Sequence, residues 1–274
     1  MYDFSVLITV YFKDSPLAFD QALTSIWYDQ ELKPKEIVLV CDGPLSESLD
    51  AVVTKWSCKA DVLLNVIRLE QNQGLPIALN TGLSECKYNI VARMDSDDIS
   101  LPGRFLKQIS FLKDNPHYSV VGSWIQEFSS SDNLHGPIRK LPVKDRDLSD
   151  FAKYRCPLNH MSVIYKKEHV LNCGGYSNLK NSQDFHLWGR MLGAGYNIAN
   201  IPEVLVLANA DYKMYQRRGG LHFIKIEYKI QRDFYRCGFL SFSEAVKSFI
   251  LRIPIRLMPG ALRSVVYKHL FRSL

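Results

Sequence analysis

Apolar and polar residues alternate in blocks along the first hundred residues of the chain. Segments with apolar residues at helical spacing lie between strand-like runs, and Ser15-Pro16 and Ser46 are typical helix starts. Runs rich in β-branched and aromatic residues predict buried strands over residues 4–12, 37–41, 62–69 and 88–94. Strand–helix alternation with continuous apolar strands predicts parallel βαβ units in an open α/β sheet.

The pattern becomes less regular in the second half. Residues 129–150 are polar and rich in turn formers, and no linker divides the chain. Apolar runs predict a helix from Pro102, strands near 120–122, 161–165 and 198–207, and a helix over 184–192. We therefore expect one α/β domain over residues 1–240, followed by a tail over 241–274.

An acidic cluster, Asp95-Ser96-Asp97-Asp98, directly follows the fourth predicted strand. Asp42 follows the second strand, and ligands of open parallel sheets bind at the carboxyl ends of the strands. Three carboxylates so close together repel each other, and Mg²⁺ or Mn²⁺ would offset their charge through oxygen ligands. A solvated acidic turn or a helix N-cap is the alternative for the cluster, and a turn before Gly43 is the alternative for Asp42.

Further polar segments admit both a chemical and a structural interpretation. Asp184 begins a predicted amphipathic helix, where it can act as a general base or merely favour the helix dipole. Arg217 and Arg218 precede two glycines, which suits either a closing loop on a phosphate or a solvated basic turn. His160 is expected to be a hydrogen-bonded core residue.

Composition fits one large domain of 274 residues, 47% hydrophobic and 23% charged. The six cysteines form no CxxC pair and are scattered, so we expect reduced thiols in a cytosolic protein. The N-terminus lacks the features of a signal peptide, and no uncharged apolar run approaches the roughly 20 residues of a membrane span.

The net charge of +6 resides in the C-terminal tail. Residues 245–274 contain six basic and no acidic side chains, interleaved with apolar ones, while the rest of the chain is close to neutral. A charge confined to the tail argues against a general nucleic-acid binding surface. It favours a basic, amphipathic helical tail that lies on anionic lipid. The alternative is a C-terminal helix that packs on the domain and exposes its basic side to water. Pro254 and Pro259 are expected to break the tail into short helices.

Six motifs together resemble the family-2 glycosyltransferases, which have the GT-A fold of a mixed, mostly parallel sheet flanked by helices. The resemblance extends over about residues 5–240. Its motifs are SVLITVYF at 5–12, EIVLVCDGP at 36–44, NQGLPIALNTG at 72–82, ARMDSDD at 92–98, QDFHLW at 183–188 and QRRGG at 216–220. Each motif alone is weak, and their order and spacing make the resemblance specific.

The resemblance implies roles for individual residues. On the donor side, Tyr11 would stack on the base, Asp42 would bind the uracil or ribose, and Arg93 would face the donor sugar or phosphate. Asp95 and Asp97 correspond to the DxD pair that binds donor and Mn²⁺ or Mg²⁺. Asp184 corresponds to the catalytic base, and Arg217 and Arg218 to a loop closing on the diphosphate.

The implied reaction is an inverting transfer of a single sugar from a nucleotide diphosphate. The chain has Gln183-Asp184 where the family often has Glu-Asp, so only Asp184 inherits the role of base. Gly219 stands where processive members carry a tryptophan, which favours transfer of one sugar over polymer synthesis.

By analogy, the pattern is similar to bacterial enzymes of O-antigen, capsule or exopolysaccharide biosynthesis that add galactose or glucose to a lipid-diphosphate-linked sugar, such as N-acetylglucosamine on undecaprenyl diphosphate. We expect a cytoplasmic protein, peripheral on the inner membrane. One alternative is a glycosyltransferase with another donor, such as UDP-GlcNAc, UDP-GalNAc or a GDP-sugar. A sugar-nucleotide pyrophosphorylase is a second alternative, but a glycine-rich loop after the first strand is typical of those enzymes, and residues 9–15 contain no glycine. The third is a non-catalytic nucleotide-sugar binding protein.

Overall fold

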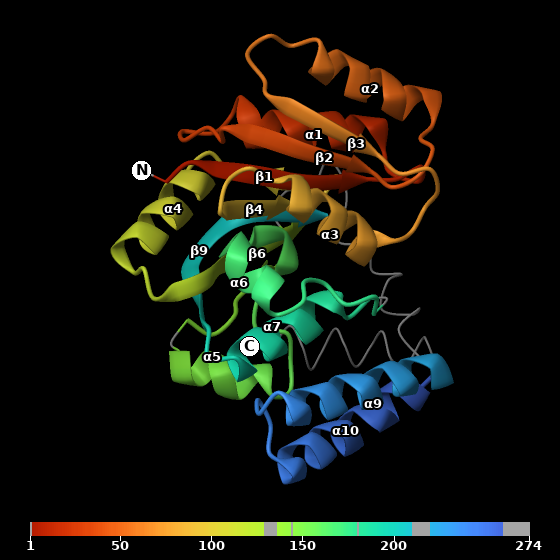
Figure 1. The fold of residues 1–274 in the computed structure, drawn as a ribbon, viewed down its shortest axis with the longest axis vertical. Helices are drawn as coiled ribbons and strands as arrows, with labels where there is room; N and C mark the ends of the chain where they lie inside the picture. Colours follow the sequence, from red (N-terminus) through yellow and green to blue (C-terminus); the bar gives the residue numbers. More distant parts are fainter. Residues whose placement is uncertain (1, 129–135, 144, 180, 210–219, 260–274) are drawn as a thin grey trace.

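The computed structural model describes residues 2–128, 136–143, 145–179, 181–209 and 220–259. A single mixed sheet organises most of this part of the chain (Figure 1). Its strands are β1 (Phe4–Val10), β2 (Glu36–Cys41), β3 (Leu64–Arg68), β4 (Ile90–Met94), β5 (Ile99–Ser100), β6 (Tyr118–Phe128), β7 (Ile138–Arg139), β8 (Ile164–Lys166) and β9 (Asn197–Asn209).

The strand order explains how separate polar segments meet. Among the described residues the order is β3-β2-β1-β4-β8-β6-β9-β5, with β7 paired to β6. Strands β3, β2, β1 and β4 run parallel, whereas β8 runs antiparallel to both β4 and β6. The predicted βαβ units are confirmed. The carboxyl ends of β1, β2 and β4 therefore lie at one edge, where Tyr11, Asp42 and Asp95 follow their strands.

Helices cover both faces of the sheet. One apolar core packs side chains of α1 (Pro16–Trp27), α2 (Glu47–Ser57) and α4 (Arg104–Asp114) against the sheet. A second core joins the opposite face to α3 (Leu75–Glu85), α5 (Asp145–Ala152), α6 (Lys167–Asn172) and α7 (Gln183–Gly193). Continuous apolar strands are thus required, because both faces of the central strands are buried.

The predicted helix starts are confirmed. Ser15 caps α1 by accepting a hydrogen bond from the backbone N–H of Ala18, and Pro16 occupies the first turn. Ser46 caps α2 in the same way through Leu49. At Gly82, in α3, an added Cβ would lie 2.3 Å from Leu7 Cδ1, so the glycine lets this helix approach the sheet closely.

Two further helices, α9 (Leu221–Arg236) and α10 (Phe242–Leu257), form an antiparallel hairpin beside α7 (Figure 1). A third apolar core fills the space between these helices. Inside the hairpin the buried carboxylate of Glu227 accepts hydrogen bonds from Arg252 at 2.8 Å and from Arg256 at 2.5 Å. The charges of these two arginines hold the pKa of Glu227 below its ordinary value, although burial acts to raise it.

Two expectations from the sequence were wrong in detail. Residues 129–150 were expected to be polar and turn-rich, and no helix was predicted among them, but α5 begins within them at Asp145. Pro254 does not break the tail, because α10 continues through it. A proline removes one hydrogen bond donor, and a helix that already packs against a neighbour can tolerate that loss.

Residues 260–274 of the predicted tail lie outside the described residues. In the part of the chain that the structure describes, no helix has the length and apolarity to cross a bilayer.

Candidate active site

An ion pair joins the buried Arg93 of β4 to the partly buried Asp95 in the turn after it. Both carboxylate oxygens of Asp95 accept hydrogen bonds from the guanidinium of Arg93, which is only 1% exposed. Burial acts to lower the pKa of Arg93, but the charge and hydrogen bonds of Asp95 outweigh it and raise that pKa. Arg93 therefore stays cationic, and its first role in this structure is to hold Asp95 in a fixed orientation.

Asp97 and Asp98 form no ion pair with an arginine or lysine among the described residues. The side chain of Asn209 donates to Asp97 at 3.1 Å, and its backbone N–H donates to Asp98 at 2.8 Å. Burial raises the pKa of Asp97 to about 6, with the negative charges of Asp95 and Asp14 adding to the effect. Burial also raises the pKa of Asp98 well above its ordinary range, and its Oδ2 atom has no hydrogen bond partner.

This excess of negative charge fits a divalent cation. Asp14 joins the cluster because it accepts a hydrogen bond from Ser96 at 2.7 Å, and burial raises its pKa as well. All the ligand atoms on offer are oxygens, which Mg²⁺ and Mn²⁺ prefer. Within the described ranges, no group of three acidic, histidine or cysteine side chains is arranged to hold a metal by itself. A metal here would therefore take part of its coordination from a bound ligand.

Asp42 lies at the same edge of the sheet and organises a loop. Its two carboxylate oxygens accept hydrogen bonds from the backbone N–H groups of Gln73 at 2.7 Å and Gly74 at 2.9 Å. Gly43 has a φ of +87°, and a Cβ there would lie 2.5 Å from the backbone nitrogen of Asn72. The Asp42 carboxylate thus bonds a loop some thirty residues further along the chain and makes no Asx-type turn, since the residue two positions on is Pro44, which has no N–H. A part of its hydrogen-bonding capacity remains for a ligand.

Tyr11 directly follows β1 and remains accessible. Its ring is 39% exposed and makes an edge contact with the ring of Phe12. Its backbone N–H donates to Asp14, which connects the segment after β1 to the acidic turn. An exposed aromatic face beside Asp42 and the acidic turn suits the predicted stacking on a nucleotide base.

Asp184 lies in the first turn of α7 and is partly buried. The thiol of Cys156 is 3.6 Å from its Oδ2 atom. The hydroxyl of the buried Tyr176 contacts Nε2 of His160 at 3.1 Å. Burial raises the pKa of Tyr176, and the negative charges of Asp184 and Asp95 act in the same direction. The role of Asp184 as general base stays a prediction.

His160 is a core residue, as predicted. Its side chain is 9% exposed, and burial lowers its pKa well below the ordinary value, with Arg93 acting in the same direction. Arg217 and Arg218 lie outside the described residues, so their predicted role stays a prediction.

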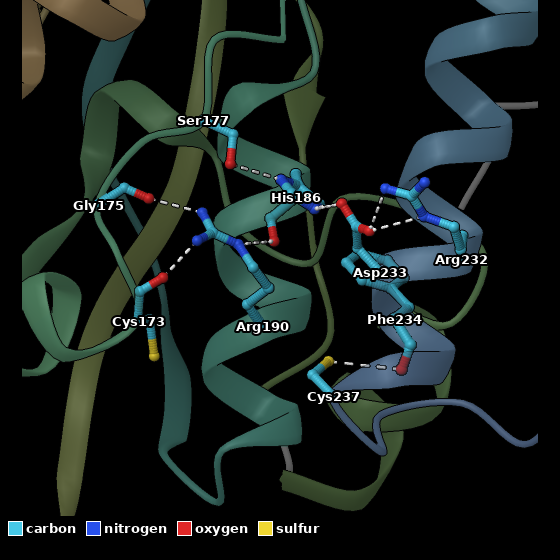
Figure 2. A network of polar contacts seen from close by, with 9 residues as sticks. All are labelled: Cys173, Gly175, Ser177, His186, Arg190, Arg232, Asp233, Phe234 and Cys237. Carbon is cyan, nitrogen blue, oxygen red and sulfur yellow. Dashed lines mark hydrogen bonds and ion pairs between the residues drawn. The ribbon is translucent and has the colours of Figure 1, made fainter.

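A polar network fixes α7 to its neighbours (Figure 2). Arg190 donates to the carbonyl oxygens of Cys173 and Gly175 in the preceding loop. The imidazole of His186 contacts Ser177 Oγ at 2.9 Å through Nδ1, and its Nε2 lies 3.3 Å from a carboxylate oxygen of Asp233 in α9. The helix that carries Asp184 is thus held between the loop before it and the C-terminal hairpin.

His186 makes the stability of this region depend on pH. Burial lowers its pKa to about 4, with Arg190 adding to the effect, whereas an unfolded histidine titrates near 6.5. The unfolded state then binds more protons below pH 6.5, so the stability contributed by neutral His186 is complete above pH 6.5 and is lost as the pH falls toward 4. Between pH 6.5 and 5 we expect a loss of about 1.5 kcal/mol.

Urea unfolding of the wild type and of His186→Asn at both pH values measures this loss. The variant is expected to lose less stability over the same interval, because it lacks the titrating group. Equal losses in the two proteins would contradict the assignment.

Several residues of this site escaped sequence reasoning. Asp14, Ser96 and Asn209 surround the predicted acidic pair, and Arg104 lies beneath it, donating to the backbone oxygen of Arg93 at 2.7 Å. Tyr176 is a further buried residue of this region, and its hydroxyl contacts Nε2 of His160. Asn209 ends β9, and Asp14 lies in the short segment between β1 and α1, so their position near a strand end was the one usable signal.

A comparison with known protein families decides the identity of the domain. Residues 5–170 match the sequence profile of the family described as "Glycosyl transferase family 2". The chain belongs to glycosyltransferase family 2.

Two relatives of this family resemble the chain over nearly its full length. The amylovoran biosynthesis glycosyltransferase AmsE of Erwinia amylovora is 40% identical over 268 residues, covering 97% of this chain and 98% of AmsE. The UDP-Gal:α-D-GlcNAc-diphosphoundecaprenol β-1,3-galactosyltransferase of Escherichia coli is 36% identical over 269 residues, covering 98% and 96%.

Solved glycosyltransferases share the fold. S. aureus TarS 1-349 in complex with UDP-GlcNAc superposes with a TM-score of 0.67 at 18% identity, covering 93% of this chain and 72% of that one. The Pyrobaculum calidifontis mannosyltransferase in complex with GDP-Man and Mn²⁺ gives a TM-score of 0.63 at 17% identity, covering 98% and 82%. The expected GT-A fold of this family-2 glycosyltransferase is thereby confirmed.

Proposed function

We propose that this family-2 glycosyltransferase transfers one hexose, galactose before glucose, from a UDP-sugar to a lipid-diphosphate-linked sugar during synthesis of a bacterial surface polysaccharide. The observation that carries this proposal is its 36% identity, over 98% of the chain, to a galactosyltransferase whose name states donor and acceptor. The similarity to AmsE supports exopolysaccharide synthesis. With an acceptor of the undecaprenyl diphosphate class, the reaction would take place at the cytoplasmic face of the inner membrane.

The donor would occupy the carboxyl edge of the sheet. Tyr11 would stack on the uracil, and Asp42, already fixed by the loop amides, would bind the base or ribose. The Asp95 carboxylate, oriented by Arg93, would accept hydrogen bonds from sugar hydroxyls. Asp97, with Asp95, would hold Mn²⁺ or Mg²⁺, and the guanidinium groups of Arg217 and Arg218 would bind the diphosphate.

Asp184 would act as the general base. Its carboxylate takes the proton of the acceptor hydroxyl while the acceptor oxygen forms a bond to the anomeric carbon from the side opposite the diphosphate. The bond from that carbon to the diphosphate oxygen breaks, and UDP leaves with the electron pair. A divalent cation held by Asp95 and Asp97 would supply positive charge to neutralise the departing diphosphate. An α-linked donor then gives a β-linked product, which is inversion.

Incubating the purified protein with Mn²⁺, a short-chain lipid-diphosphate-GlcNAc analogue and single sugar nucleotides tests the proposal. The panel includes UDP-Gal, UDP-Glc, UDP-GlcNAc, UDP-GalNAc and GDP-sugars, and the product is detected by mass. We expect one added hexose from UDP-Gal and loss of product with EDTA, restored by excess Mn²⁺. UDP binding without product from any donor would reject the acceptor, and absence of UDP binding would reject the donor as well.

A further inference from the structure

The C-terminal hairpin exposes an unusual number of large apolar side chains. On α9 these line up at seven-residue intervals, and on α10 most recur four residues apart, so on each helix they share a side. The exposed residues that share this side, with their exposed fractions, are Leu221 (74%), Tyr228 (58%), Tyr235 (50%), Phe242 (69%), Val246 (40%), Ile250 (59%) and Leu257 (59%). Leu251 (55%) is exposed too, but it lies on another side of α10.

Ring contacts join the two helices into one surface. Tyr235 of α9 meets Phe242 of α10 at a centroid distance of 5.9 Å, and Tyr228 meets Phe249 at 6.2 Å. These pairs bring the apolar side of α9 next to that of α10. We call the surface formed by these exposed residues of both helices, together with the basic residues described next, the hairpin face.

The charges of the hairpin are segregated. On α9, Lys225, Lys229 and Arg236 are exposed and lie along the helix beside Tyr228 and Tyr235. They form a basic border next to the aromatic side chains. The hairpin face thus combines aromatic, aliphatic and lysine side chains within one surface.

The acidic residues of the hairpin point elsewhere. Residues 221–257 contain three of them, and each is engaged by a partner inside the hairpin or on the body of the protein. Glu227 is buried with Arg252 and Arg256, Asp233 lies beside His186, and Glu244 pairs with Lys153 and caps α10. No carboxylate in these helices therefore offsets the exposed lysines.

We propose that the hairpin face docks on an anionic lipid bilayer. Tyrosine and phenylalanine side chains favour the boundary between headgroups and acyl chains, and adjacent lysines attract anionic headgroups. A second copy of the chain is a poor occupant, because a two-fold contact through this face would bring its basic residues together. The surface lies on α9 as well as α10, and so extends beyond the tail over 241–274 that the sequence indicated.

Docking in this way would bring the base close to the membrane. Phe185, the residue after Asp184, packs its ring against Phe234 of α9 at 5.2 Å, and Arg252 of α10 lies over the same ring at 4.4 Å. The inner side of the hairpin thus supports the turn that carries Asp184. This step rests on the proposed function, since it places a lipid-anchored acceptor beside the proposed base.

Flotation of the full-length protein with vesicles tests the docking without donor or acceptor. We expect binding to vesicles of phosphatidylglycerol and phosphatidylethanolamine, weaker binding to phosphatidylcholine, and release by salt. Two double variants are expected to lower the partition coefficient at least about tenfold. In Lys225→Glu with Lys229→Glu the reason is charge, because each basic residue near an anionic surface contributes about fivefold. In Phe242→Ser with Ile250→Ser the reason is the loss of apolar side chains that would enter the bilayer boundary.

Matched substitutions elsewhere on the surface serve as controls. Lys87→Glu with Lys113→Glu, and Leu63→Ser with Leu171→Ser, change exposed side chains outside the hairpin and should leave binding within about twofold. Thermal unfolding identifies any variant that fails to fold. Wild-type binding by the folded hairpin variants, equal binding to neutral vesicles, or no wild-type binding would each overturn the docking.

The activity assay separates this inference from the proposed function. Transfer to a water-soluble acceptor should be unchanged in the hairpin variants, whereas transfer to the same acceptor in anionic vesicles should fall about as far as binding does. If no acceptor is ever glycosylated, the proposed function fails, while the vesicle result still stands or falls on its own.

Discussion

Replacing Asp184 with asparagine is expected to lower the turnover number about a thousandfold, within the range that general base catalysis contributes. The amide has nearly the same shape but cannot accept the acceptor proton. Because Asp184 is in the first turn of α7 and takes no part in the donor edge of the sheet, the affinity for UDP should not change. Initial rates with saturating donor and acceptor, together with UDP titration, measure the two effects separately.

Cys156 provides the matched control for this substitution. Its thiol lies 3.6 Å from Asp184 Oδ2, so Cys156→Ala alters the surroundings of the carboxylate and leaves the carboxylate in place. We expect this variant to keep most of its activity. A turnover number for Asp184→Asn within tenfold of the wild type would show that another group accepts the proton.

Replacing Asp95 with asparagine is expected to destabilise the fold by about 3 kcal/mol, because it leaves the charge of Arg93 buried without its partner. The guanidinium is 1% exposed and cannot reach water in its present position. Urea unfolding in metal-free buffer measures the loss, and the absence of metal confines the comparison to the protein's own charges.

The neighbouring substitution Asp97→Asn is expected to change the free energy of unfolding in the opposite direction, or not at all. The folded-state pKa of Asp97 is raised to about 6, so its ionised form opposes folding at neutral pH and its removal relieves repulsion. Its unfolding free energy should therefore stay the same or rise, although both variants should lose transfer activity. Equal destabilisation by the two substitutions would contradict this division between a carboxylate held by Arg93 and one left for a cation.

Local sequence patterns predicted the scaffold of the site well. The apolar strands and the serine caps at Ser15 and Ser46 depend on neighbouring residues alone, which is why they could be recognised. The meeting of Asp42 with the acidic turn followed from the parallel topology. The Arg93–Asp95 pair also had a signal in the sequence, since alternate residues of a strand point to the same side.

Contacts between distant segments were not predictable in the same way. Ser96 bonds Asp14 across 82 positions, and Asn209 reaches the acidic turn from β9 across more than a hundred. Nothing local specifies such partners. Pro254 was misjudged for a related reason: its effect on α10 depends on packing against α9, and tertiary packing outweighs local propensity there.

The buried contact of Glu227 with Arg252 and Arg256 bears on how this enzyme can be recombined with its relatives. A chimera that takes α10 from a donor lacking either arginine, while keeping α9, would leave the Glu227 carboxylate without its counter-charges in an apolar interior. The two helices are therefore exchangeable only together. Grafts with a junction before Gly220 should yield folded hybrids, whereas junctions in the turn between the helices should not.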